Sequence, residues 1–193
     1  MTLIEQIDDI LPQTQCRQCG YDGCMAYACA IAMEGAPINR CAPGGQKGID
    51  ELARLLDRPS CALDPEYGQE VPLEVAQINA EQCIGCRKCV AVCPTNAIVG
   101  APKRLHGVLT DWCTGCALCV TPCPVDCIEM VPAPCEWPRE RAHAARDLYR
   151  AKRVREEKRE KQRLQKLETD SDSARAKKKA LIASILDQVN LKI

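Results

Sequence analysis

Two cysteine groups of identical spacing stand out in the sequence, thirty residues apart. Each follows the pattern C-x2-C-x2-C-x3-C-P, in which three closely spaced thiolates can wrap one face of an iron–sulfur cubane. The fourth cysteine of each group lies too far along the chain to close the same cubane, so it is expected to bind the other one. Numbered along the chain, cluster 2 is assigned to Cys83, Cys86, Cys89 and Cys123, and cluster 3 to Cys113, Cys116, Cys119 and Cys93.

Zinc is the competing metal for such cysteines. Zinc sites use pairs of C-x2-C separated by longer loops, so zinc is not expected in either group. Gly85 and Gly115 permit the tight backbone turn that each cubane loop needs. Crossed ligation would also join the two halves of this segment, in a chain that has no Phe and only 3% aromatic residues to build a core. We therefore expect two [4Fe–4S] clusters here.

A third cysteine group near the N-terminus has a different spacing. Cys16, Cys19 and Cys24 are close together in the sequence, and Cys41 follows after sixteen intervening residues, next to a Pro-Gly-Gly turn. Four soft thiolates of this kind can hold either a zinc ion or a cubane. The spacing by itself leaves both metals open.

The other chemically active residues receive no role in metal binding. Cys29 and Cys127 are interpreted as small buried hydrophobic residues. Cys61 and Cys135 lie in proline-rich stretches. Because all three four-cysteine groups are complete without them, no ligand role is assigned to either. The two histidines, His106 and His143, are expected at the surface. The chain has no phosphate-binding loop, nucleophile elbow or dinucleotide fingerprint, so no catalytic residue is assigned.

The sequence predicts an α+β fold with a charged helical extension. Residues 1–60 form a small helical domain whose first helix carries Leu3, Ile4, Ile7, Ile10 and Leu11 on one face. Residues 61–72 form a linker. Residues 73–131 contain the repeat, and each copy is predicted as strand, cluster loop, short helix and strand, with strands near 75–78, 97–99, 107–109 and 127–130. Two such copies give a domain with pseudo-two-fold symmetry.

Residues 132–193 are predicted to form a basic helical tail. A helix is expected from 140 to 167, a break at 169–173, and a last helix over 180–191. That last helix carries an apolar stripe of Leu181, Ile182, Ile185, Leu186 and Val189. Interleaved glutamates and the lack of aromatic residues argue against nucleic-acid binding, so the tail is interpreted as a docking element. It could fold back on its own acidic body, or bind an acidic partner or an anionic membrane surface; a solvated helix without a partner is the alternative.

Charge and hydropathy indicate where in the cell the chain works. Residues 1–135 contain nine Lys and Arg against sixteen Asp and Glu, whereas residues 136–180 contain sixteen against nine. There is no signal-peptide pattern and no apolar run of about 18 residues. We therefore expect a cytoplasmic protein, attached at most peripherally to the inner face of the membrane, in which reduced cysteines serve as metal ligands.

Two strings around the first cysteine group resemble a known family. Residues 11–24 and 38–45 resemble the Fe–S domain of the B subunit of the Rnf electron transport complex, also called Rsx. The resemblance covers about residues 3–131 and includes the order of the two cluster domains. It implies a [4Fe–4S] cluster, cluster 1, on Cys16, Cys19, Cys24 and Cys41, and three clusters in all. Typical members begin with a transmembrane anchor and lack the basic tail, so the chain departs from the family at both ends.

These ligand sets favour electron transfer over catalysis on a small molecule. A cubane with four cysteine ligands has no open position for a substrate, but it can change its charge by one unit with little rearrangement. The resemblance implies redox protein partners in a membrane-bound complex of the Rnf type. Two alternatives remain open: a soluble relay for another low-potential oxidoreductase, and a sensor of oxygen or iron. A sensor generally needs an exposed or incompletely ligated cluster.

Overall fold

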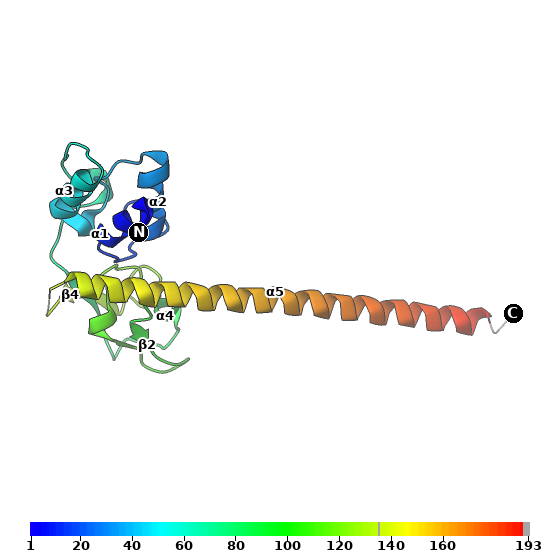
Figure 1. Ribbon diagram of the computed structural model, residues 1–193. Helices are drawn as coiled ribbons and strands as arrows, with labels where there is room; N and C mark the ends of the chain where they lie inside the picture. Colours follow the sequence, from blue (N-terminus) through cyan, green and yellow to red (C-terminus); the bar gives the residue numbers. More distant parts are fainter. Residues whose placement is uncertain (135, 191–193) are drawn as a thin grey trace. The chain divides into compact units, whose positions relative to one another are not determined.

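The fold is that of a computed structural model of the chain, which describes residues 1–134 and 136–190. Residues 1–152 form one compact unit, and the chain from Arg153 onward forms a second (Figure 1). The first unit contains two separate hydrophobic cores, one among the N-terminal helices and one between short strands. Helices combined with small antiparallel sheets give the α+β class that the sequence predicts.

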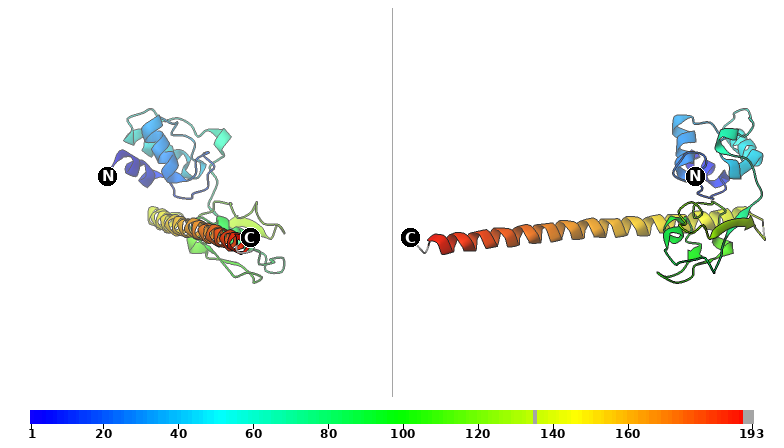
Figure 2. Two further views of the ribbon diagram at one scale, coloured as in Figure 1. Left: turned by 90° about the vertical axis from the view of Figure 1, so that its right-hand side faces the viewer. Right: turned by 180° about the vertical axis from the view of Figure 1, so that it is seen from behind.

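Three helices build the N-terminal core: α1 (Leu3–Ile10), α2 (Cys24–Glu34) and α3 (Gly45–Leu55) (Figure 2). The first begins with a capping box, in which the Thr2 backbone N–H donates to Glu5 Oε2 at 2.8 Å. The predicted apolar face of α1 points into this core, except at Leu3, which is 43% exposed. The short 3-10 helix η1 (Ala42–Gly44) directly precedes α3, and a second one, η2 (Pro65–Tyr67), lies in the segment after α3.

The second core lies between two antiparallel strand pairs. Strand β1 (Glu74–Ile78) pairs with β4 (Ile128–Pro132), so the two ends of the cysteine repeat are joined. Strand β2 (Ile98–Val99) pairs with β3 (Gly107–Val108) inside the repeat. All four predicted strands are present, with their ends shifted by one or two residues. Their apolar side chains and the cysteines fill a core that contains no aromatic side chain among the described residues.

The two copies of the repeat differ after their cluster loops. Helix α4 (Lys88–Val92) follows the first loop, but residues 118–122 of the second copy form turns, so the predicted second helix is wrong. Pro122 stands where the first copy has Val92. Proline has no N–H to donate and disfavours helical geometry at the residue before it. The second copy instead has the 3-10 helix η3 (Thr110–Trp112) ahead of its loop.

Helix α5 (Arg139–Asn190) runs without interruption, so the predicted break at 169–173 is wrong. That stretch contains no Gly or Pro, and Thr, Ser and Asp each cost less than about 0.7 kcal/mol in a helix. The Thr169 hydroxyl donates to the Lys166 carbonyl at 2.8 Å within the helix. Leu181 and Ile182 are exposed, whereas Leu191 and the side chains of Ile185, Leu186 and Val189 lie outside the described residues. Within the described range, no helix is both long and apolar enough to cross a membrane.

Candidate iron–sulfur centres

The four N-terminal cysteines assigned to cluster 1 line one cavity. They reach it from the loop after α1, from the first residue of α2 and from the residue before η1. Gln15 helps to hold this loop, because its Oε1 accepts the backbone N–H of Cys24 at 3.0 Å. Tyr27 also lines the cavity, and its hydroxyl donates to the Pro37 carbonyl at 2.7 Å. The cysteine side chains converge here, as a four-thiolate site requires.

Burial makes these thiols hard to ionise in the absence of a metal. It raises the pKa of Cys24 to about 12 and the pKa of Cys41 well above its ordinary value, and the neighbouring cysteines add to both shifts. Thiolates in such a place need a positive group beside them, and iron supplies it. The donor set of this cavity therefore fits an iron–sulfur cluster.

A second cavity collects the four cysteines assigned to cluster 3. Cys93 comes from the first copy of the repeat, and Cys113, Cys116 and Cys119 come from the second. Backbone N–H groups point at two of these sulfurs, from Ala97 to Cys93 Sγ at 3.2 Å and from Ala76 to Cys113 Sγ at 3.4 Å. Donors of this kind stabilise the thiolate form. The crossed assignment thus has its four side chains at one place.

Burial acts on the cluster 3 cysteines as it does on the N-terminal group. It raises the pKa of Cys116 to about 11 and that of Cys119 to about 12. The loop between Cys113 and Cys116 turns at Gly115, whose φ is +70°. A Cβ at Gly115 would lie 2.5 Å from the Glu74 carbonyl oxygen, so a larger residue would displace strand β1.

The cysteines assigned to cluster 2 are more exposed. Cys86 and its neighbour Ile84 lie at the surface, whereas Cys89 and Cys123 are buried. Burial raises the pKa of Cys89, and the charges of Cys86 and Cys83 add to the shift. Cys127 belongs to the core as predicted, but its sulfur also lies 3.5 Å from that of Cys123. The sequence gives no sign of this sulfur contact, because Cys127 stands outside the repeated pattern.

His106 is buried beside cluster 2, so its predicted place at the surface is wrong. Only 3% of the residue is exposed, and its Nδ1 lies 3.3 Å from Cys89 Sγ. The register of β2 and β3, continued by one pair, sets His106 opposite Gly100, where a Cβ would collide with the imidazole. A glycine facing a histidine across a short hairpin is the signal that sequence reasoning missed.

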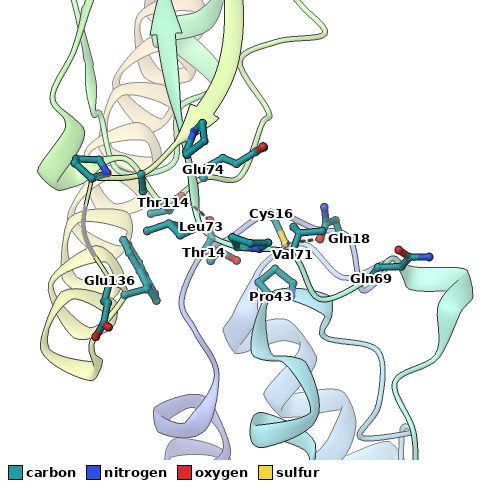
Figure 3. A pocket seen from close by; sticks show the side chains of 16 residues that line it. Thr14, Cys16, Gln18, Pro43, Gln69, Val71, Leu73, Glu74, Thr114 and Glu136 are labelled. Carbon is teal, nitrogen blue, oxygen red and sulfur yellow. Dashed lines mark hydrogen bonds between the residues drawn. The ribbon is translucent and has the colours of Figure 1, made fainter.

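The loops of clusters 1 and 3 meet directly. The Thr114 hydroxyl donates to the Thr14 carbonyl at 2.9 Å, and both residues are buried. A pocket of about 620 Å³ opens beside this contact, with Cys16 and Val71 among its lining residues (Figure 3). Thr14 lies two residues before Cys16, and Thr114 directly follows Cys113. The contact therefore joins one cysteine loop to the other through a single hydrogen bond.

Acidic residues of α1 bind the first turns of α5. Asp8 is 1% exposed, and its Oδ2 lies 3.1 Å from Arg150 and 3.6 Å from Arg146. The neighbouring Asp9 contacts His143 at 2.8 Å, which leaves that histidine only partly exposed. The Trp137 indole donates to the Pro12 carbonyl at 2.7 Å. The sequence left open that the basic tail folds back on its acidic body, but it did not indicate that Asp8 and Asp9 are the carboxylates that bind it.

No three His, Cys, Asp or Glu side chains in 1–134 and 136–190 converge closely enough to hold a single metal ion. In a cubane each thiolate binds a different iron, so its four sulfurs stand farther apart than the ligands of one ion.

Two family profiles match the cysteine-rich part of the chain. The 4Fe-4S dicluster domain matches residues 76–130, and a putative Fe-S cluster family matches residues 11–43. Both matches enclose the cysteine groups described above. The class that fold and site define is therefore an iron–sulfur protein with a dicluster domain.

Curated relatives identify the family more closely. The chain is 57% identical over 132 residues to the B subunit of the ion-translocating oxidoreductase complex of Hahella chejuensis, a match that covers 68% of this chain and 66% of the relative. The same subunit of Azoarcus sp. is 58% identical over 130 residues, or 67% of this chain and 71% of the relative. That of Aliivibrio fischeri is 57% identical, with 70% of each chain covered.

The chain belongs to this family, the B subunits of Rnf-type electron transport complexes, which confirms the resemblance seen in its motifs. It is an iron–sulfur electron-transfer protein. The matched segment spans about two thirds of the length of the relatives.

Proposed function

We propose that the chain relays single electrons through three [4Fe–4S] clusters. Residues 1–60 act as a one-cluster domain and residues 73–131 as a two-cluster domain, joined by the linker at 61–72. The observation that carries this proposal is the convergence of two predicted four-cysteine sets, each at one cavity. The third set, which includes Cys83, Cys86 and Cys89, has the same loop spacing as one of these two.

When bound, each cluster supplies a one-electron redox centre. The chain's own residues exclude water from the buried thiolates and direct backbone N–H groups at them. The hydrogen bond from Thr114 to Thr14 holds the loops of clusters 1 and 3 together. We infer that electrons pass between these two clusters across that contact.

The exposed edge of cluster 2 is the proposed place of exchange with a redox partner. Lys103 donates its backbone N–H to the Gly85 carbonyl at 3.0 Å, so the loop of Lys103 and Arg104 lies over the cluster 2 loop. Arg87 and Lys88 follow Cys86 in that loop, and all four basic side chains are exposed. We call these four residues the basic collar. They are the only Lys and Arg between residues 59 and 135 of an otherwise acidic segment.

The relatives are named as subunits of an ion-translocating oxidoreductase complex. We propose that this chain works in a complex of that kind, with other redox proteins as its partners, at the inner face of the cell membrane. The chain would then take electrons at one cluster and release them at another, without binding a substrate of its own.

Iron and sulfide analysis of the anaerobically prepared protein tests the cluster content. We expect about twelve iron and about twelve acid-labile sulfide per chain, because each of three complete sets would hold one cubane. About eight of each with one zinc would contradict the assignment of cluster 1. Repeated reduction and reoxidation should leave the iron content unchanged, and loss of a cluster in each cycle would favour a sensor instead.

A further inference from the structure

Lys152 buries a positive charge in the first compact unit. Only 9% of the residue is exposed, although it belongs to a helix whose following residues face solvent. Its ammonium donates hydrogen bonds to the Ala91 carbonyl at 2.8 Å and to the Cys93 carbonyl at 2.7 Å. Removing a charged group from water is costly unless such partners replace the water. The buried ammonium therefore binds the one backbone segment that supplies these carbonyls, and that segment contains Cys93.

The two carbonyls belong to the C-terminal end of α4, whose C-cap is Cys93. The last carbonyls of a helix lack intrahelical donors and carry a partial negative charge. An ammonium placed here gives the Ala91 carbonyl a donor, adds a second donor to the Cys93 carbonyl, which also accepts the Asn96 N–H at 3.4 Å, and complements the charge of both. Lys152 thereby fixes the backbone at the point where the chain leaves the cluster 2 loop.

The side chain of Cys93 extends from this backbone into the cavity of cluster 3. Its sulfur lines that cavity with Cys113, Cys116 and Cys119, and it accepts the Ala97 backbone N–H at 3.2 Å. The ammonium thus binds the main chain of a residue whose thiolate faces the cluster. Charges in a protein interior are screened less than in water, so they interact more strongly at the same separation.

The position of Lys152 is held from the opposite side of α5 as well. Arg146 and Arg150, on the two preceding turns, form ion pairs with the buried Asp8 at 3.6 and 3.1 Å. These contacts fix the helix axis, so the ammonium stays at the end of α4. A charge on a mobile surface side chain would be largely screened by salt.

We propose that Lys152 is a positioning residue that raises the reduction potential of cluster 3. The inference rests on the proposed function, since it requires a cluster bound by Cys93, Cys113, Cys116 and Cys119. Reduction transfers one electron from a reduced partner protein to the cluster, with no bond made or broken and no proton moved. The added negative charge is stabilised by the nearby ammonium, so the reduced form gains more from Lys152 than the oxidised form does.

Redox titration of the full chain with its clusters, followed by electron paramagnetic resonance, tests this role. Lys152→Met removes the charge and both hydrogen bonds, and Lys152→Gln removes the charge but keeps an N–H donor. Lys152→Arg keeps the charge. Arg153→Gln is the matched control, because it removes a positive charge from the adjacent residue, whose side chain is 49% exposed.

We expect a lower potential for cluster 3 alone in the Met and Gln variants, and a potential close to that of the unaltered protein in the Arg variant and the control. No shift in the Met and Gln variants would overturn the inference, while three reversible clusters would leave the proposed function intact. Loss of cluster 3 from both variants would also overturn it, since Lys152 would then be purely structural. An unaltered protein without a cluster at Cys93 would contradict the proposed function itself.

Discussion

Cys93 lies next to one cluster loop in the sequence and faces the other in space. It follows Cys89 by four residues, yet its sulfur lines the cavity of Cys113, Cys116 and Cys119. Helix α4 carries the chain about 6 Å along its axis from Cys89 to Cys93, so the Cys93 sulfur can reach the neighbouring cavity. At the scale of single residues, nearness in the sequence is therefore a poor guide to which cysteines share a cavity.

Replacing Cys93 with Ser should alter cluster 3 and leave cluster 2 intact. A serine hydroxyl is a harder and less acidic ligand than a thiol, so the iron that it binds should be lost or shifted in potential. Electron paramagnetic resonance that resolves the two centres provides the measurement, with Cys29→Ser as the control outside all three sets. A selective change in cluster 2 would mean that the crossed assignment is wrong.

The imidazole of His106 should tune cluster 2. With cluster 2 bound, Cys89 would be a thiolate with no proton to give, so in the contact of 3.3 Å the ring would donate from Nδ1 to Cys89 Sγ. Hydrogen bonds to cluster sulfurs raise the reduction potential. His106→Leu should therefore lower the potential of cluster 2 in a redox titration. His143→Leu is the control, since His143 contacts only the α1 carboxylate Asp9 among the pairs described; equal shifts in both variants would contradict this role.

At the scale of elements, α1 contacts the start of α5 through charged side chains. Two aspartates near the end of α1 meet four basic side chains from the first turns of α5. The Arg139 guanidinium adds a bond to Glu51 of α3 at 2.8 Å. A helix that carries charged residues on most faces has little apolar surface for packing, so these polar contacts fix its first four turns.

Asp8→Asn should lower the free energy of unfolding of the first compact unit by about 2 kcal/mol. The substitution keeps the shape of the side chain, but it leaves Arg146 and Arg150 without their buried carboxylate partner. Chemical denaturation of the protein with its clusters bound measures the loss. Asp22→Asn is the matched control, because its ion pair with Arg17 is exposed on both sides and should contribute less than about 1 kcal/mol. Equal losses would show that burial of Asp8 adds nothing.

At the scale of the whole molecule, the boundary between the two compact units falls within α5, between Lys152 and Arg153. Residues 139–152 contact the cysteine-rich body, and the chain from Arg153 onward forms its own unit. The acidic body and the basic start of α5 thus meet within one chain. If the tail docks to a partner, we expect the residues beyond Lys152 to make that contact, because those before it already bind the body.

Two truncations should separate these parts. A chain ending at Lys152 should keep all three clusters and their potentials, because it retains the contacts of Asp8, Asp9 and α4 with the first turns of α5. A chain ending at Pro138 should be less stable and should have a lower potential for cluster 3, because it lacks Lys152 and the ion pairs with Asp8. Iron analysis and redox titration of both chains give the comparison. Identical potentials in the two truncations would contradict a role for the first turns of α5.

The basic collar should govern association with an acidic redox partner at cluster 2. Charge reversal of Lys103 and Arg104 to Glu should slow electron exchange with an acidic electron carrier several-fold at low salt, and the difference should shrink as salt screens the charges. Stopped-flow kinetics across a range of ionic strength measure both effects. Reversal of Arg54 and Arg58, basic residues outside the collar, is the control. A rate that is unchanged at low salt would exclude the collar as the docking surface.

The sequence by itself determined the α+β class and the family, and it supplied the proposed ligand sets, because iron–sulfur ligation depends on short cysteine spacings that are read along the chain. It also placed the four strands, since each lies beside a cluster loop of fixed length. Three features were not predicted. Local backbone propensities decided the uninterrupted α5 and the turn at Pro122, and packing of the β2–β3 hairpin decided the burial of His106. The contacts of Lys152 with α4 and of Asp8 with α5 join residues 59 to 142 positions apart. Only the tertiary structure could bring such distant charges together, because their partners are chosen by geometry in space and leave no periodic trace in the sequence.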